Sequence, residues 1–252
     1  MQRSQLGGLG ARKAEIMVDD RVTKGGRIPT LILVFFLIDL GLGLVYLGDY
    51  LAGRPSRMLT GFFDLDGEAN IPAWYSSIQW FCTALLLGIF AHRHVSLSRP
   101  KSWPIAALSL VFLVISVDEI AVIHEQAGGL SDRLLPGGSR RNIAFSQTGI
   151  WMLLLGVPLI VLLLRLILLV RPYFRRAPRA LVRLSLGIAI ALAGATGIEI
   201  LSNFVTPGST NSVLQVLAEE MWEMLGGTIA LWGSYEVLQA HEFRLTLDEL
   251  EV

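Results

Sequence analysis

The sequence is poor in cysteine, in glycosylation sites and in charge. Cys82 is the only cysteine among 252 residues, so neither an intrachain disulfide nor a cluster of thiolate metal ligands can form. No Asn-x-Ser/Thr sequon occurs, which agrees with a bacterial source. Charged residues make up 17% of the chain, against about 25% in an average soluble domain. The formal net charge is zero, so charge gives no reason to expect a nucleic-acid partner.

The first 27 residues lack the features of a signal peptide. They mix acidic and basic side chains before any apolar run begins, and no small-residue cleavage site follows a short apolar stretch. We therefore expect residues 1–27 to form a cytoplasmic arm.

Hydrophobic residues make up 53% of the chain and occur in long blocks. A helix rises about 1.5 Å per residue, so a block of about 20 residues crosses a hydrocarbon core of about 30 Å. Six blocks reach that length: residues 30–51, 72–92, 104–126, 145–170, 182–203 and 212–238. They lack the alternation of barrel strands. The sequence therefore predicts an all-α, polytopic membrane bundle of six transmembrane helices in residues 28–240, with a cytoplasmic tail at 241–252.

Lysine and arginine are distributed unevenly between the predicted loops. Fifteen of the 21 fall on the side that holds the arm, the second and fourth loops and the tail, and five fall on the other side. Cytoplasmic loops are enriched in Lys and Arg, so both termini are predicted to be cytoplasmic. The expected location is the cytoplasmic (inner) membrane of a bacterium, with membrane lipids as neighbours.

Ionisable residues are numerous inside the predicted spans. Each costs about 2.5–3.5 kcal/mol at the membrane centre on insertion scales, so each is a functional candidate by default. Asp39 lies alone near mid-membrane, and we leave it unassigned. The others gather near the outer ends of the third, fifth and sixth spans: Asp118, Glu119, His124, Glu125, Glu199, Glu219, Glu220 and Glu223. Ser76 and Ser77 add polar groups at the same level of the second span. This shared depth predicts one polar pocket, built from four segments and open to the extracytoplasmic side.

Helical spacing refines this pocket. At about 100° per residue, Asp118 and Glu125 lie on one face of a continuous helix, and Glu219 and Glu223 lie on one acidic stripe. The glycine pairs at positions 41 and 43, and at 226 and 227, are expected to permit close approach of neighbouring helices.

Three motifs occur together in this chain: Asn70-Ile-Pro-Ala-Trp-Tyr-Ser-Ser77, Ser116-Val-Asp-Glu-Ile-Ala-Val-Ile-His-Glu125 and Glu219-Glu-Met-Trp-Glu-Met-Leu-Gly226. They resemble motifs of uncharacterised multi-spanning bacterial membrane proteins of similar length, and this resemblance supplies no activity. A looser similarity is to membrane hydrolases of the alkaline ceramidase and adiponectin-receptor type, which use Ser, Asp and His around zinc. This similarity implies that Ser77, Asp118 and His124 would be the corresponding Ser, Asp and His. Glutamates replace the late His-x-x-x-His pair of that family, so three-histidine zinc is not expected.

One histidine among many carboxylates forms a hard ligand set that suits manganese, magnesium, calcium or iron. The expected metal ligands are Asp118, His124, Glu199 and Glu219. A metal-bound water would attack an ester, amide or phosphate of a lipid-like substrate, with Glu125 or Glu223 as general base. Ser77 is a further catalytic candidate. On this hypothesis the chain is a metal-dependent membrane hydrolase.

Two other classes of function stay open. Crowded carboxylates in a low dielectric cannot all be ionised, so the pocket could carry protons or bind a cation in a coupled transporter. The inner half of the spans is nearly all apolar apart from Asp39, which counts against a continuous path. The third class is a non-catalytic subunit whose acidic pocket binds a lipid, a pigment or a membrane-protein partner. A homo-oligomer is equally compatible with the sequence.

Overall fold

The computed structural model describes residues 28–97, 103–130, 134, 148 and 150–248. The chain divides into two compact units, residues 1–34 and 35–252, and every contact discussed below lies within the second. All regular structure in the described part of the chain is helical. The predicted all-α class is therefore confirmed, whereas the predicted arm, residues 1–27, lies outside the described residues.

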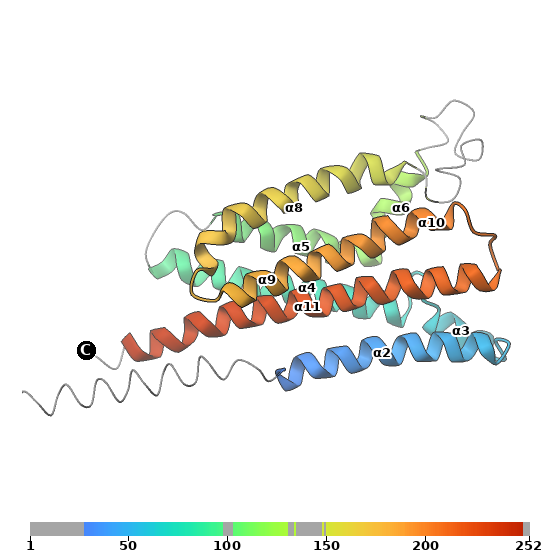
Figure 1. The fold of residues 1–252 in the computed structure, drawn as a ribbon, viewed down its shortest axis with the longest axis horizontal. Helices are drawn as coiled ribbons and strands as arrows, with labels where there is room; N and C mark the ends of the chain where they lie inside the picture. The colour runs from blue at the N-terminus through green and yellow to red at the C-terminus, as the bar shows by residue number, and fades with distance from the viewer. Residues whose placement is uncertain (1–27, 98–102, 131–133, 135–147, 149, 249–252) are drawn as a thin grey trace, which may run out of the picture. The chain divides into compact units, whose positions relative to one another are not determined.

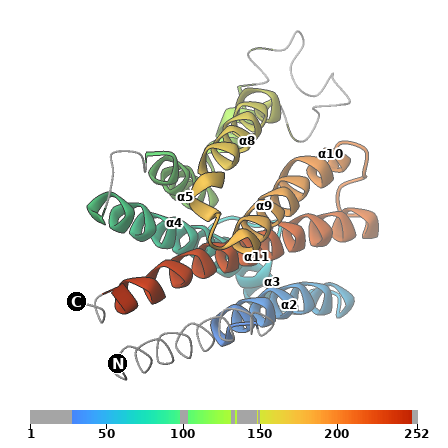
Figure 2. The ribbon, with the colours of Figure 1, turned by 60° about the vertical axis from the view of Figure 1, so that its left-hand side comes forward.

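Long helices dominate the second unit, and Figures 1 and 2 both show α4, α5, α8, α9 and α11 running lengthwise along one another. The complete order is α2 (Thr30–Leu51), α3 (Arg57–Phe63), α4 (Ile71–Leu97), α5 (Trp103–Ala121), α6 (Ile123–Gly128), η3 (Met152–Gly156), α8 (Val157–Val170), η4 (Arg171–Phe174), α9 (Pro178–Leu192), η5 (Ala193–Ile198), α10 (Glu199–Ser202) and α11 (Thr210–Asp248).

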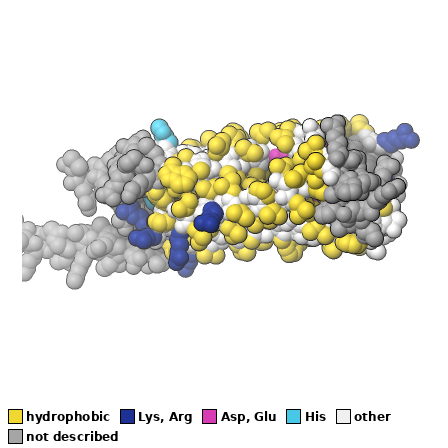
Figure 3. All heavy atoms as spheres, turned by 90° about the horizontal axis from the view of Figure 1, so that it is seen from above, with side chains coloured by type: hydrophobic (Ala, Val, Ile, Leu, Met, Phe, Trp, Pro, Cys, Tyr) yellow, Lys and Arg dark blue, Asp and Glu magenta, His cyan; other side chains and the backbone are white. Residues whose placement is uncertain are grey.

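Within the described residues, five helical segments are long and apolar enough to cross a membrane. They are Thr30–Leu51, Ile71–Arg93, Trp103–Ala121, Met152–Phe174 and Pro178–Ser202. They overlap the first five predicted spans, with different ends, and indicate integration into a membrane. Figure 3 shows hydrophobic side chains covering the middle of one face, with Lys and Arg side chains near its ends, as a lipid-facing surface requires.

The predicted sixth span falls on α11, which is longer and more polar than the others. It has 39 residues, which corresponds to a length of about 58 Å. It carries Glu219, Glu220, Glu223 and Glu236, so it does not meet the apolarity of the other five segments. The helix also continues past residue 240, where the sequence predicts a separate tail. A sixth crossing by α11 therefore stays a prediction.

The third span ends earlier than predicted. The helix was expected to run to residue 126, but α5 ends at Ala121 and α6 begins at Ile123. Val122 between them has a φ of 55°, in the left-handed region that a β-branched residue rarely adopts. His124 and Glu125 thus lie on a separate short helix, and the predicted common face of Asp118 and Glu125 is wrong.

Helices α9 and α11 pack backbone against backbone through small residues. A Cβ on Gly226 would lie 2.5 Å from the amide nitrogen of Ala191 and 2.6 Å from the carbonyl oxygen of Gly187. The expected close approach at Gly226 is therefore confirmed. The same expectation is wrong for Gly41, because no atom lies within 4 Å of the position that its Cβ would occupy.

Candidate functional site

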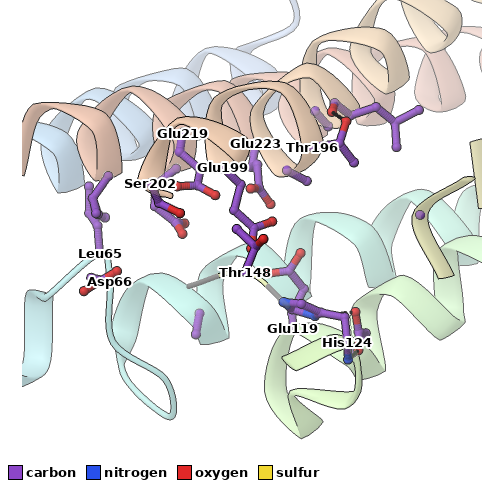
Figure 4. A pocket seen from close by; sticks show the side chains of 18 of the residues that line it. Leu65, Asp66, Glu119, His124, Thr148, Thr196, Glu199, Ser202, Glu219 and Glu223 are labelled. Atoms are coloured by element: carbon purple, nitrogen blue, oxygen red, sulfur yellow. Dashed lines mark hydrogen bonds and ion pairs between the residues drawn. The ribbon is translucent and has the colours of Figure 1, made fainter. Parts of the chain in front are cut away.

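A partly enclosed cavity of ≈ 440 Å³ lies among α4, α5, α6, α8, α9, α10 and α11. Among the described residues, eight carboxylates and one histidine line it, with no lysine or arginine. Its ionisable residues are Asp66, Glu68, Asp118, Glu119, His124, Glu199, Glu219, Glu220 and Glu223. Figure 4 shows Glu119, Glu199, Glu219 and Glu223 reaching toward one another from three elements. The cavity is therefore a strongly acidic compartment.

The structure brings together most of the residues singled out from the sequence. The predicted metal ligands Asp118, His124, Glu199 and Glu219 all line the cavity, and so does the predicted base Glu223. Their functional roles remain predictions.

Ser77 is buried in the interface between α4 and α5 instead. Its hydroxyl donates to the carbonyl oxygen of Ser116 at 2.7 Å, and the Ser116 hydroxyl donates back to the Ser77 carbonyl at 2.9 Å. This reciprocal pair ties two helices together, and Ser77 is not part of the cavity lining. The side chain of Glu125 lies outside the described residues.

Asp118 shapes the turn that presents His124 to the cavity. One of its oxygens, Oδ1, accepts the backbone N–H of His124 at 3.0 Å, and the other lies 2.8 Å from Nδ1 of the same histidine. The carboxylate thus stabilises the break at Val122 and fixes the orientation of the imidazole.

The histidine is connected to Glu199 through an aromatic residue. The ring of Trp151 packs against His124 with centroids 4.9 Å apart, and its indole N–H donates to Glu199 Oε1 at 3.1 Å. Glu199 directly follows η5, a π-helical segment, and such segments are frequent at functional sites. Trp151 directly precedes a second one, η3. Two irregular segments therefore border the same cavity.

Gly194 brings η5 against the acidic stripe of α11. A Cβ at this position would lie 2.8 Å from the Glu219 carbonyl oxygen and 2.9 Å from Glu223 Cγ. On α11 itself, the Gln215 amide donates to Glu219 Oε2 at 2.5 Å and orients that carboxyl group. The predicted acidic stripe of Glu219 and Glu223 thus lies at a packed interface with η5, and both side chains line the cavity.

The deeper wall of the cavity is apolar. Trp80 and Phe112 stack with ring centroids 5.5 Å apart, and Leu163 and Ile188 face the same space. Phe112 precedes Asp118 by six residues on α5, which places it about 9 Å further along the helix. The site is therefore amphipathic, with an acidic end and a hydrocarbon-like end.

No metal site is preassembled in the part of the chain that the structure describes. No group of three or more His, Cys, Asp or Glu side chains there lies close enough together to hold a metal ion. The carboxylates surround a space large enough for an organic molecule and do not converge on a point.

Comparison with known proteins identifies the family. A family model described as "Domain of unknown function (DUF8692)" matches residues 30–238. The chain belongs to this family. No curated protein and no solved structure matches it. The matched region contains every residue of the cavity, so the cavity lies within the part of the chain that defines the DUF8692 family.

Asp66 and Trp151 are two of the cavity residues that sequence reasoning missed. Asp66 lies in the loop between α3 and α4, outside any span, and its only signal is its proximity to Glu68 and Asn70 at the predicted outer face. Trp151 is one of several tryptophans near predicted span ends, which are common at membrane interfaces in any case. Only the packing of α6 against η3 shows that it contacts His124.

Proposed function

We propose that this membrane protein binds a positively charged, amphipathic molecule in the acidic cavity, at the extracytoplasmic face. The observation that carries the proposal is the lining: eight carboxylates surround one cavity, and none of the described lining residues is a lysine or arginine. A ligand with an ammonium or amine group would neutralise part of this charge, and its hydrocarbon portion would lie along the apolar inner wall.

The size of the cavity agrees with a small organic ligand. Sites for such molecules usually enclose about 300–1,000 Å³ and combine apolar walls with a few polar groups. A cation that leaves water for this cavity would be compensated by carboxylates on several helices at once. Such compensation is required when a charge enters a low dielectric.

The direction of opening follows from the topology. The exposed Arg171, Arg175 and Arg176 surround η4, which joins α8 and α9 at one end of both helices. Glu199 and Trp151 lie at the opposite ends of the same two helical segments. Positively charged loops face the cytoplasm, so the acidic end would face the exterior.

The test uses dodecylamine and dodecanol as probes on the full chain in lipid nanodiscs at pH 7. We expect dodecylamine to raise the melting temperature progressively with its concentration, because a ligand that binds only the folded state stabilises it. Dodecanol has the same hydrocarbon chain and no charge, so it should have little effect. In the double variant Glu219→Gln/Glu223→Gln, amine binding should weaken at least tenfold, which is about 1.4 kcal/mol.

Asp49→Asn is the matched control. Asp49 is a buried carboxylate on α2 that accepts the Thr60 hydroxyl at 2.7 Å and does not line the cavity. It should bind dodecylamine as the wild type does. Equal stabilisation by amine and alcohol, or unchanged amine binding in the double glutamate variant, would contradict the proposal.

A second candidate is a metal-dependent hydrolase of a lipid-like substrate. The observation that favours it is the Asp118–His124 pair, because a histidine held by a carboxylate through Nδ1 is the usual arrangement of a metal-binding or acid–base imidazole. The described side chains do not form a ready ligand set, so a metal would have to draw the carboxylates together.

Metal content decides between the two candidates. If the chain is a metal enzyme, elemental mass spectrometry of the detergent-purified protein should find a near-stoichiometric divalent metal. The metal should be lost in both His124→Ala and Glu223→Gln. A folded wild type that binds no metal after dialysis against manganese, magnesium, calcium and iron would eliminate the hydrolase candidate.

A further inference from the structure

A second polar site lies away from the acidic cavity, around Asp39 on α2. Asp39 is fully buried, and its polar neighbours Gln79 and Thr228 are fully buried as well. Tyr75, on α4 with Gln79, completes the group and is 6% exposed. None of these four residues lines the cavity.

Three donors from two helices converge on the Asp39 carboxyl group. Its Oδ1 accepts the Tyr75 hydroxyl at 2.7 Å and the Gln79 amide at 2.9 Å, and its Oδ2 accepts the Thr228 hydroxyl at 2.8 Å. No cationic side chain of the described residues pairs with it. An ionised carboxylate in a membrane interior normally has such a partner.

The Tyr75 hydroxyl has two acceptors for its single hydrogen. Besides Asp39 Oδ1, it lies 2.9 Å from the backbone carbonyl oxygen of Phe35. When Asp39 is ionised, Tyr75 can donate to the carboxylate. When Asp39 is protonated, the acid can donate to the Tyr75 oxygen, and Tyr75 can then donate to Phe35. Both states are hydrogen-bonded without any movement of the helices.

From this geometry we propose that Asp39 is a proton-binding site inside the membrane, and that Tyr75 acts as its switch between two acceptors. The ligand is a proton, which Asp39 gains and loses while the group stays buried. This site is separate from the proposed cation cavity, so neither proposal depends on the other.

The surroundings of Asp39 are otherwise neutral. From α4, Tyr75 is its titratable contact and Gln79 its neutral one, while α11 presents Thr228 and the carbonyl of Met224 to the same group. On α11, Glu219, Glu220 and Glu223 line the acidic cavity instead, and Glu236 pairs with Arg183. When Asp39 is ionised, no described neighbouring side chain carries a balancing positive charge. Binding a proton removes this uncompensated charge, so proton uptake at Asp39 is favoured.

Infrared difference spectroscopy tests the proposal on the full chain in nanodiscs. Spectra recorded between acidic and alkaline pH should contain a carboxylic C=O stretch that shifts in D₂O. We expect Asp39→Asn to lose this band and the control Asp49→Asn to retain it. We expect Tyr75→Phe to keep the band at a higher frequency, since the protonated acid then loses its hydrogen-bond acceptor.

The outcomes separate a proton site from its alternatives. A difference spectrum that is identical in wild type and Asp39→Asn means that Asp39 never changes its protonation, and the proposal fails. A carboxylate signal of Asp39 that responds to sodium and not to pH would assign the site to a metal cation and overturn it as well. If Asp39→Asn does not fold, the frequency shift in Tyr75→Phe still decides, because that variant retains the carboxyl group.

Discussion

Replacing Gly226 with alanine is expected to destabilise the protein by about 3 kcal/mol, at the upper end of the usual cost of overpacking. The added methyl group would lie 2.5 Å from a backbone nitrogen and 2.8 Å from the Cβ of Ala191, closer than real side chains approach. Two of the three nearest atoms belong to the backbone of α9, so no flexible side chain can move away. The helices must separate along their whole contact, which includes Gly187 and Gly233.

The measurement is thermal or SDS-induced unfolding of the purified variant, and Gly41→Ala is its matched control. Gly41 is also a helical glycine in a span, but its Cβ would meet nothing within 4 Å. Alanine favours a helix over glycine by about 0.5–1 kcal/mol, so Gly41→Ala should be neutral or slightly stabilising. Equal stability of the two variants would show that α9 and α11 do not pack as described.

The helical class and the five apolar segments could be predicted from the sequence because the bilayer leaves few alternatives. A backbone in hydrocarbon must satisfy its own hydrogen bonds, so long apolar blocks become helices of predictable length. The depth of a side chain then follows from its position in the block. This explains why Asp118, Glu199 and Glu223, which lie far apart in the sequence, were placed correctly in one pocket.

The direction in which each side chain points from its helix was less predictable. Ser77 was predicted to lie in the pocket, but it faces α5 and its hydroxyl donates to the carbonyl oxygen of Ser116. The break at Val122 has no glycine or proline signal, since the local sequence is Ile-Ala-Val-Ile. This break depends on the Asp118 carboxylate, which contacts both the backbone N–H and the ring nitrogen Nδ1 of His124. The π-helical segment before Glu199 likewise changes the angular register without a local sequence signal.

The hydrogen-bond network of Asp39 was the least predictable part of the structure. Sequence analysis could identify Asp39 as an anomaly in an apolar span, but its partners are 36, 40 and 189 residues away. Tyr75 and Gln79 both lie on the second predicted span, and no sequence pattern links them to Asp39. Only the packing of α4 and α11 around α2 shows that Tyr75, Gln79 and Thr228 donate hydrogen bonds to the same carboxyl group.

This network gives the second large expected effect: Asp39→Leu should destabilise the protein by about 1–3 kcal/mol. Tyr75 keeps the Phe35 carbonyl as an acceptor, and one Gln79 N–H keeps the carbonyl of Met224. The other Gln79 N–H keeps the Thr228 oxygen, 2.7 Å away, whereas the Thr228 hydroxyl loses the acceptor shown here. An unsatisfied buried donor costs about 1–3 kcal/mol. Unfolding of the purified variant, measured as for Gly226→Ala, gives the loss.

Two further variants separate lost hydrogen bonds from the loss of the carboxyl group itself. Asp39→Asn keeps an acceptor oxygen and should retain most of the stability. Adding Thr228→Val to Asp39→Leu removes the hydroxyl donor that has lost its acceptor, so the double variant should be more stable than Asp39→Leu alone. A buried donor and acceptor that are both replaced by apolar groups can be nearly neutral in stability, whereas a stranded donor cannot. Strictly additive losses in the double variant would mean that Thr228 and Asp39 are not energetically coupled, although their side chains lie 2.8 Å apart.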